Sequence, residues 1–151
     1  MRIHLLALVL SVMGAGAGAG EQASVRKPLG ETWDAIFIGG GRAGHVRTLF
    51  EEVAQDGKKH IAATVSMRLQ VKRFDDVISL GMVSGTVEDE QGRVVGTFLR
   101  QFLGKNKRIE VTGTVKEGKL HLLQDGAEAL PPLPWNAKAL GIHHQHGMFQ
   151  K

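Results

Sequence analysis

A glycine-rich stretch at residues 34–44, DAIFIGGGRAG, has the residue types and spacing of a phosphate-binding turn. In dinucleotide-binding enzymes such glycines let the backbone turn tightly beside a pyrophosphate, which sits on the N-terminus of the following helix. An apolar stripe with helical spacing follows the glycines, at Val46, Leu49, Phe50, Val53 and Ala54. Dinucleotide binding is therefore one hypothesis, and it requires a strand before the glycines and a helix after them.

The residues further along weaken this hypothesis. The acidic residue that binds a ribose hydroxyl in such enzymes is expected about 20 positions later, yet residues 58–74 contain no Asp or Glu. The same letters also fit a β-hairpin, with residues 33–38 and 43–53 as strands and residues 39–42 as the turn. The hairpin is the preferred interpretation, and a helix at residues 45–55 stays open as the alternative.

Other groups in the sequence have the residue types of metal or acid–base sites. Three imidazoles gather near the C-terminus, at His143, His144 and His146. A structural metal site needs about four ligands, and no Asp, Glu or Cys lies nearby in sequence to supply the fourth. Acidic groups at residues 51–52, 75–76 and 88–90 lie among turn residues, so we expect solvated turns there. We predict no catalytic, cofactor-binding or metal-binding residue, and no cofactor.

Composition excludes two further classes of chemistry. The chain has no cysteine, which rules out a disulfide framework, a thiolate metal site and a cysteine nucleophile. The formal net charge is +4, but the basic residues are scattered along the sequence and are not interleaved with aromatic residues. A nucleic-acid partner is therefore not expected.

The elements that would position these residues begin after a predicted signal peptide at residues 1–19. Arg2 precedes an apolar run at residues 5–13, followed by alternating Ala and Gly. The run is too short to span a bilayer, so no stable membrane span is expected, and small residues suited to signal peptidase follow it. Cleavage is expected after Ala17 or Ala19, which places the mature protein in the periplasm or outside the cell.

Three further regions are predicted in the mature chain. A polar leader occupies residues 20–32, an antiparallel β domain residues 33–128, and a Pro-rich, His-containing tail residues 129–151. Prolines in the tail segment LPPLPW are expected to end strand pairing there. Trp33 and Trp135 are expected to close the two ends of the core, because large aromatic side chains dominate burial.

The β domain is predicted from a period-two alternation of apolar and polar residues, clearest at residues 61–72, IAATVSMRLQVK. No stretch after residue 57 has helical spacing. Segments with turn chemistry interrupt the alternations at residues 39–42, 55–58, 74–76, 89–93, 103–106, 116–119 and 124–126. The predicted fold is all-β, an antiparallel up-and-down meander of about seven long strands that forms a curved sheet or half-open barrel.

The order of these pieces resembles the N-terminal extracytoplasmic β-domain that precedes the catalytic domain in certain bacterial transglutaminase-like proteins. The resemblance covers nearly the whole mature chain and rests on turn and strand patterns at residues 33–44, 66–74, 87–96, 118–120 and 134–141. The catalytic core of such proteins uses a Cys-His-Asp triad. Because this chain lacks cysteine and stops just past the segment that would lead into the core, the resemblance implies no catalytic residue here.

The expected function is that of a secreted, non-catalytic accessory or interaction module, either a stand-alone relative or a chain truncated before its enzyme domain. Its expected partner is a protein or a catalytic domain that packs on the sheet. The alternative is a periplasmic carrier that binds a hydrophobic ligand or lipid on a curved β-sheet, because an apolar sheet face needs cover. Dinucleotide binding through the GGGRAG stretch has less support than either.

Overall fold

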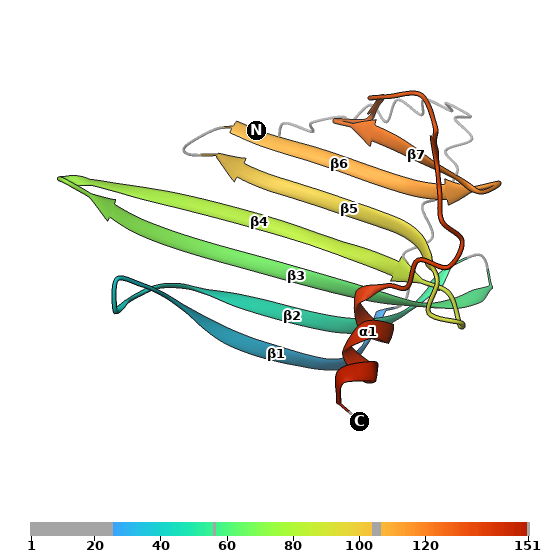
Figure 1. Cartoon of the computed structure of the whole chain (residues 1–151), viewed down its shortest axis with the longest axis horizontal. Coiled ribbons are helices and arrows are strands. Elements are labelled where there is room, and N and C mark those ends of the chain that lie inside the picture. Colours follow the sequence, from blue (N-terminus) through green and yellow to red (C-terminus); the bar gives the residue numbers. More distant parts are fainter. Residues whose placement is uncertain (1–25, 56, 104–106, 151) are drawn as a thin grey trace, which may run out of the picture.

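The computed structural model describes residues 26–55, 57–103 and 107–150, and the predicted signal peptide lies outside these ranges. The described chain is an antiparallel sheet with one short helix near its C-terminal end (Figure 1). The strands are β1 (Arg26–Ile38), β2 (Gly41–Gln55), β3 (Lys58–Arg73), β4 (Asp76–Glu88), β5 (Val94–Leu103), β6 (Lys107–Lys116), β7 (Lys119–Gln124), β8 (Ala127–Glu128) and β9 (Leu133–Pro134). The helix is α1 (Ile142–Phe149).

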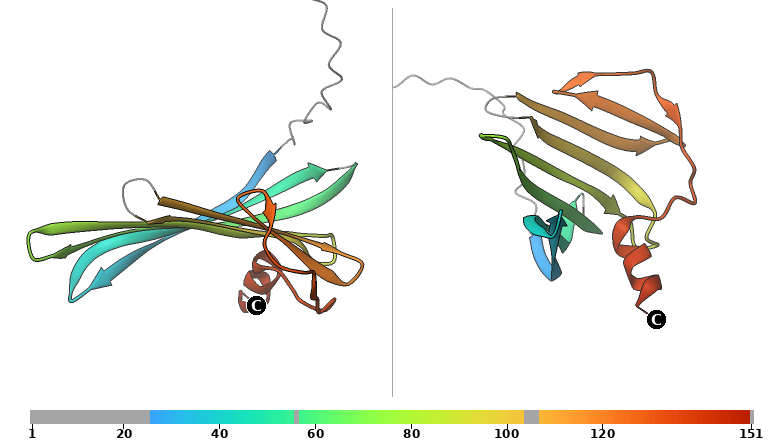
Figure 2. Two further views of the ribbon diagram at one scale, coloured as in Figure 1. Left: turned by 90° about the horizontal axis from the view of Figure 1, so that it is seen from above. Right: turned by 60° about the vertical axis from the view of Figure 1, so that its left-hand side comes forward.

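The nine-stranded sheet is a meander, as predicted. Strands β1 to β8 lie side by side in chain order, and β9 pairs with β7. Strands β1 and β8 lie at opposite ends of this order, so the sheet is open and forms no barrel. Seen from above, it is a twisted single layer, with α1 on one of its two faces (Figure 2). Most of the sheet therefore has no second layer of secondary structure against it.

The predicted turn segments lie between consecutive strands, apart from residue 56 and residues 104–106 of two of these segments, which are outside the described ranges. Gly39 and Gly40 connect β1 to β2 with φ angles of 58° and 81°, the left-handed conformations of a two-residue type I′ hairpin. Left-handed pairs at residues 117–118 and 125–126 connect β6 to β7 and β7 to β8. Such turns match the right-handed twist of the strands they join, which explains the long twisted ribbons.

Strand β2 decides between the two interpretations of residues 45–55. These residues pair with β1 on one side and β3 on the other, so they form a strand and the helical alternative was wrong. The helical spacing of the apolar residues is overridden because each β2 residue has a partner on both neighbouring strands. The helix N-terminus on which a pyrophosphate would sit is therefore not formed after the glycines.

Three elements differ from the predictions. Strand β1 begins at Arg26, before Trp33, and it includes Pro28 because an edge strand with a bulge tolerates proline. The LPPLPW segment does pair with the sheet, but only through the two residues of β9. Helix α1 was not predicted, since its sequence IHHQHGMF has little apolar periodicity.

Buried side chains are few and lie toward one end of the sheet. In the described part of the chain the buried apolar residues are Phe50, Val53, Ala62, Ala63 and Val94, and the only fully buried large side chain is that of Glu88. Helix α1 lies over this end of the sheet (Figure 1). The opposite end, formed by the β1–β2 and β3–β4 hairpins, carries exposed apolar residues that include Phe37, Ile38, Val77 and Ile78.

Candidate functional site

One face of the sheet is apolar across most of its strands, and we call it the apolar face. Paired residues of neighbouring strands lie on the same face of a sheet, and successive residues of one strand lie on opposite faces. The register joins Val46, Met67, Met82, Gln101 and Ile109 across β2 to β6. The same alternation adds further members of the apolar face, namely Val65, Leu69, Val71, Ile78, Leu80, Leu99, Val111, Leu120 and Leu122.

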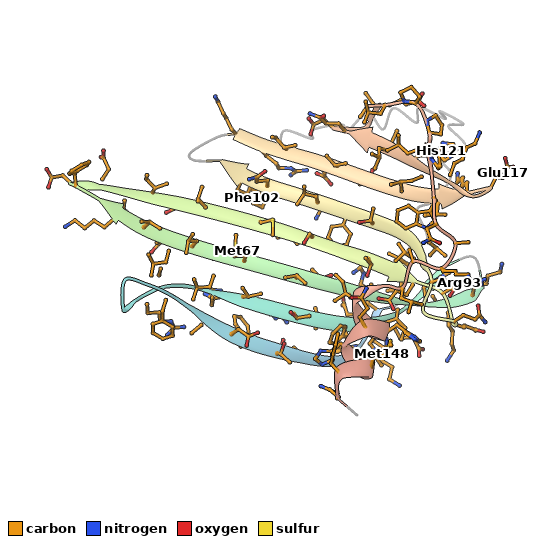
Figure 3. All side chains as sticks on the ribbon, in the orientation of Figure 1. Met67, Arg93, Phe102, Glu117, His121 and Met148 are labelled. Atoms are coloured by element: carbon orange, nitrogen blue, oxygen red, sulfur yellow. The ribbon has the colours of Figure 1, made fainter. Side chains whose placement is uncertain are left out.

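The apolar face is only partly shielded from solvent. The residues just named are half-buried, except Ile78 and Leu80, which are 43% and 37% exposed. Met67, near the middle of β3, stands on the sheet with no secondary structure above it (Figure 3). Soluble proteins rarely leave contiguous apolar patches of this extent uncovered unless the patch binds something. The apolar face is therefore the principal candidate functional site.

Helix α1 covers one end of the apolar face. The Phe50 ring of β2 packs against the rings of His143 and His146, each with its ring centroid 5.2 Å away. The described residues contain no cluster of His, Cys, Asp and Glu suited to a metal ion. Two of the three C-terminal imidazoles thus pack on an aromatic core residue, and His144 lies on the same helix.

Glu88 attaches α1 to the sheet. Its carboxylate accepts hydrogen bonds from the backbone N–H groups of His143 at 2.7 Å and His144 at 3.0 Å. The Thr86 hydroxyl donates a further bond to it at 3.2 Å. The first N–H groups of a helix have no partner within the helix, and a carboxylate there satisfies them and opposes the positive end of the helix dipole. A buried carboxyl group in the sheet thus fixes the start of α1.

Two glycines allow this close approach. A Cβ atom at Gly141, the residue before α1, would overlap the Glu88 carboxyl. Gly92 has a φ of 75°, and a Cβ atom there would overlap the His144 ring. The Gly141 N–H also donates to the Gly92 carbonyl at 3.0 Å. The β4–β5 loop and the segment before α1 therefore fit together only because both positions lack a side chain.

Asp89 shapes the same β4–β5 loop. Its carboxylate accepts bonds from the backbone N–H groups of Gln91 and Arg93, both at 2.9 Å, and from Arg93 Nε at 2.7 Å. Burial acts to raise the pKa of Asp89, but the hydrogen bonds from Arg93 and Gln91 outweigh it, and the pKa is lowered overall. The loop that carries Gly92 is thus held by an ionised aspartate.

The prediction of solvated turns was wrong for Glu51 and Glu52, which lie half-buried within strand β2 and have basic partners. Glu51 pairs with Arg26 at 3.1 Å and Glu52 with Lys59 at 3.4 Å. Of the three acidic residues at positions 88–90, Glu88 was wrongly predicted to be a solvated turn residue. The period-two alternation could have found it, because Glu88 continues the same-face series through Leu80, Met82, Ser84 and Thr86.

Trp33 does not close the core. It is 58% exposed on the face opposite the apolar face, where its ring lies 5.2 Å from the His45 ring and the Arg47 guanidinium lies 5.5 Å from its centroid. Arg47 also donates to Glu31 at 2.6 Å, and this bond, together with one from Trp33, lowers the pKa of Glu31. Trp135 is half-buried beside β7, where its backbone N–H donates to the Gly118 carbonyl.

Comparison with known protein families, curated proteins and solved structures gives no significant match. Among the described residues, no helix has the length and hydropathy that crossing a membrane would require. The functional assignment therefore depends on the apolar face and on the groups around it.

Proposed function

We propose that this chain is a non-catalytic interaction module that binds a protein partner over the apolar face of its sheet. The single observation that carries the proposal is the extent of that face, which continues from β2 to β7 and is covered by α1 only at one end. A sheet with one apolar face is stable when another layer packs on it. The partner would supply that layer.

The resemblance to the N-terminal domain of transglutaminase-like proteins agrees with this proposal. Such a domain precedes a catalytic domain, and a folded protein domain is the kind of partner that an extended sheet face suits. On this view the module acts outside the cytoplasm after loss of a signal peptide. It performs no chemistry itself but packs against an enzyme or presents something to it.

The alternative of a hydrophobic-ligand carrier receives less support from the shape of the sheet. Sites for small ligands bury about 70–90% of the ligand surface in a cleft or cavity. An open, twisted single layer covers an acyl chain from one side only (Figure 2). A protein surface, which is itself extended, suits the apolar face better than a lipid chain does.

A matched pair of variants tests the proposal. Val111 lies on the apolar face, and its neighbour Thr112 lies on the opposite face and is exposed. Val111→Glu and Thr112→Glu add the same charge one residue apart on β6. Circular dichroism first establishes that both variants remain folded.

The measurement is quantitative mass spectrometry of proteins that co-purify with each tagged chain from the cell that naturally makes it. We expect at least one extracytoplasmic protein to be recovered with wild type and Thr112→Glu, and to be lost with Val111→Glu. Equal recovery with both variants would place the contact elsewhere. Titration with a fluorescent fatty acid completes the design, because saturable binding that Val111→Glu abolishes and Thr112→Glu preserves would favour the carrier instead.

A further inference from the structure

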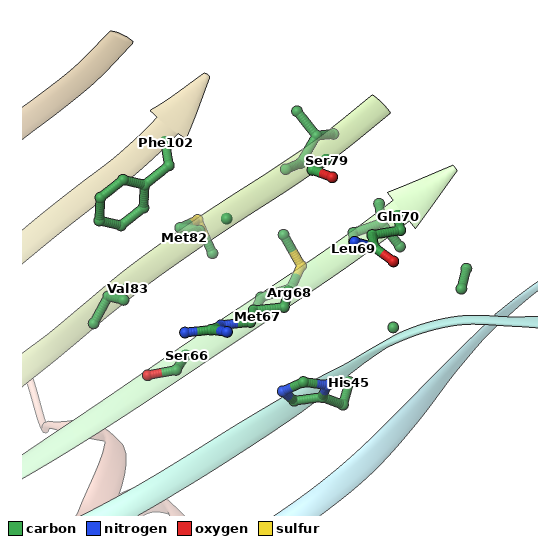
Figure 4. Close-up of a pocket in the computed structure, with 14 residues that line it drawn as sticks. His45, Ser66, Met67, Arg68, Leu69, Gln70, Ser79, Met82, Val83 and Phe102 are labelled. Carbon is green, nitrogen blue, oxygen red and sulfur yellow. The ribbon is translucent and has the colours of Figure 1, made fainter. Parts of the chain in front are cut away.

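A hollow of about 720 Å³ lies above strands β2 to β5. By the strand alternation most of its lining side chains lie on the face opposite the apolar face, and its lining also includes Met67, Leu69, Leu80 and Met82. The register places His45, Arg68, Gly81 and Phe102 in one row across these strands. Because Gly81 has no side chain, space opens between Arg68 on β3 and Phe102 on β5. Figure 4 shows Arg68 lying between His45 on one side and Phe102 on the other.

Basic groups gather around this hollow. A second hollow of about 390 Å³ adjoins it, shares His45 and Gln70 with it, and is also lined by Arg42 and Lys72. Neither lining includes an aspartate or a glutamate. Three permanent positive charges, from Arg42, Arg68 and Lys72, therefore face one region of the sheet without a carboxylate among them.

Arg42 and Arg68 differ from five other arginines in having no ionic partner. Those five are each paired with a carboxylate, namely Arg26, Arg47, Arg93, Arg100 and Arg108. Within the described residues, Arg42, Arg68 and Lys72 make no ion pair and no side-chain hydrogen bond. Their charges are available to a ligand.

The remaining lining residues define what kind of ligand would fit. Ser66, Gln70 and Ser79 offer hydroxyl and amide donors, and they too make no side-chain hydrogen bond within the described chain. Phe102 leans over Gly81, with its Cδ2 atom 3.4 Å from the position that a Cβ atom would take, and forms an apolar wall with Val83. The hollow thus combines anion-binding groups on one side with an aromatic surface on the other.

We propose that this hollow binds a small organic anion, one that joins a carboxylate or phosphate group to an apolar or aromatic body. Guanidinium groups suit carboxylate and phosphate oxygens because they donate two parallel hydrogen bonds. The volume lies in the range of small-molecule sites, about 300–1,000 Å³. The charged groups of the site lie on the face opposite the partner surface proposed above.

The test is an NMR titration of the ¹⁵N-labelled chain, residues 20–151, at low salt. The probe is phenyl phosphate, and benzyl alcohol is the neutral probe of similar shape. Phenyl phosphate is expected to shift the amide signals of Gly44, His45 and Gly81 saturably, while benzyl alcohol leaves them within error. Shifts confined to other regions, or equal shifts with benzyl alcohol, would overturn the proposal.

Two double variants of equal charge change decide whether the cations of the hollow are responsible. Arg42→Gln with Arg68→Gln removes two charges that line the hollows, and Lys116→Gln with Lys119→Gln removes two from the β6–β7 hairpin, outside both linings. The arginine variant is expected to weaken phenyl phosphate binding about tenfold or more, and the lysine variant less than about twofold. Equal weakening by both would mean non-specific attraction and would refute the site. Both outcomes are independent of the Val111→Glu experiment.

Discussion

Replacing Glu88 tests whether one buried carboxylate holds α1 on the sheet. The carboxylate accepts two helix N–H groups, at 2.7 Å and 3.0 Å, and a hydrogen bond to a charged group contributes about 1.5–3 kcal/mol. In Glu88→Gln one oxygen remains as an acceptor, while the amide NH₂ faces an N–H that it cannot bind. We expect the free energy of unfolding to fall by about 2 kcal/mol, the value of one such bond.

Glu88→Ala removes both acceptors, and the expected loss is about 3–4 kcal/mol. The loss is limited by detachment of α1, because a helix released into water recovers hydrogen bonds to solvent for its free N–H groups. Both variants therefore weaken the attachment of α1 to the sheet. The fraction of molecules with α1 detached should be larger in Glu88→Ala than in Glu88→Gln.

Urea denaturation followed by far-UV circular dichroism measures the loss, and hydrogen exchange over residues 142–149 reports whether α1 has detached. Glu90→Gln is the matched control, since Glu90 is exposed in the adjacent loop. Its effect should stay within about 0.5 kcal/mol, as for most surface substitutions. If Glu88→Gln were as stable as wild type, with unchanged protection of the α1 amides, the role assigned to Glu88 would be wrong.

Four further substitutions test the same end of the sheet. Gly141→Ala should destabilise the protein because the new methyl group overlaps Glu88, whereas Gly147→Ala, with open space at its Cβ, should stabilise α1 by about 0.5–1 kcal/mol; thermal melts compare the two. The lowered pKa of Asp89 stabilises the folded protein above the ordinary pKa of 3.8, and this stability is lost as the pH falls through the folded pKa. In Asp89→Asn the free energy of unfolding should therefore depend less on pH below about pH 4. If the free energy of unfolding of Asp89→Asn fell with pH as steeply as that of wild type, the bonds from Arg93 to Asp89 would not stabilise the fold. Phe50→Ala should cost about 3–5 kcal/mol in urea denaturation, as for other buried aromatics, and a cost below 1 kcal/mol would show that α1 is not packed on it.

The meander could be predicted from sequence because its signals are local. The alternation at residues 61–72 fixes one strand and its two faces, and Gly-containing pairs mark the hairpins, so strand order follows from chain order. The helical stripe at residues 46–54 supported a helix only as the alternative to the preferred hairpin. It is a local pattern, and pairing with β1 and β3 overrides it.

Helix α1 and the hollow could not be predicted because they depend on contacts between distant segments. The helix begins where Glu88, more than fifty positions earlier in the chain, provides acceptors for its first N–H groups. His45, Arg68 and Phe102 meet only through the register of four strands, and in the sequence their charges look scattered. Alternation places each residue on a face, but only the register shows which residues are neighbours.

Site-specific photo-crosslinking tests whether a protein partner covers the open apolar face. A photoreactive side chain at Met67, on the apolar face, is compared with one at Thr112 on the opposite face, in the cell that naturally makes the protein. We predict that Met67 crosslinks to one defined extracytoplasmic protein or domain and that Thr112 does not. Crosslinks from both positions to the same set of proteins, or from Met67 to lipid alone, would contradict the proposal that a protein partner binds the apolar face.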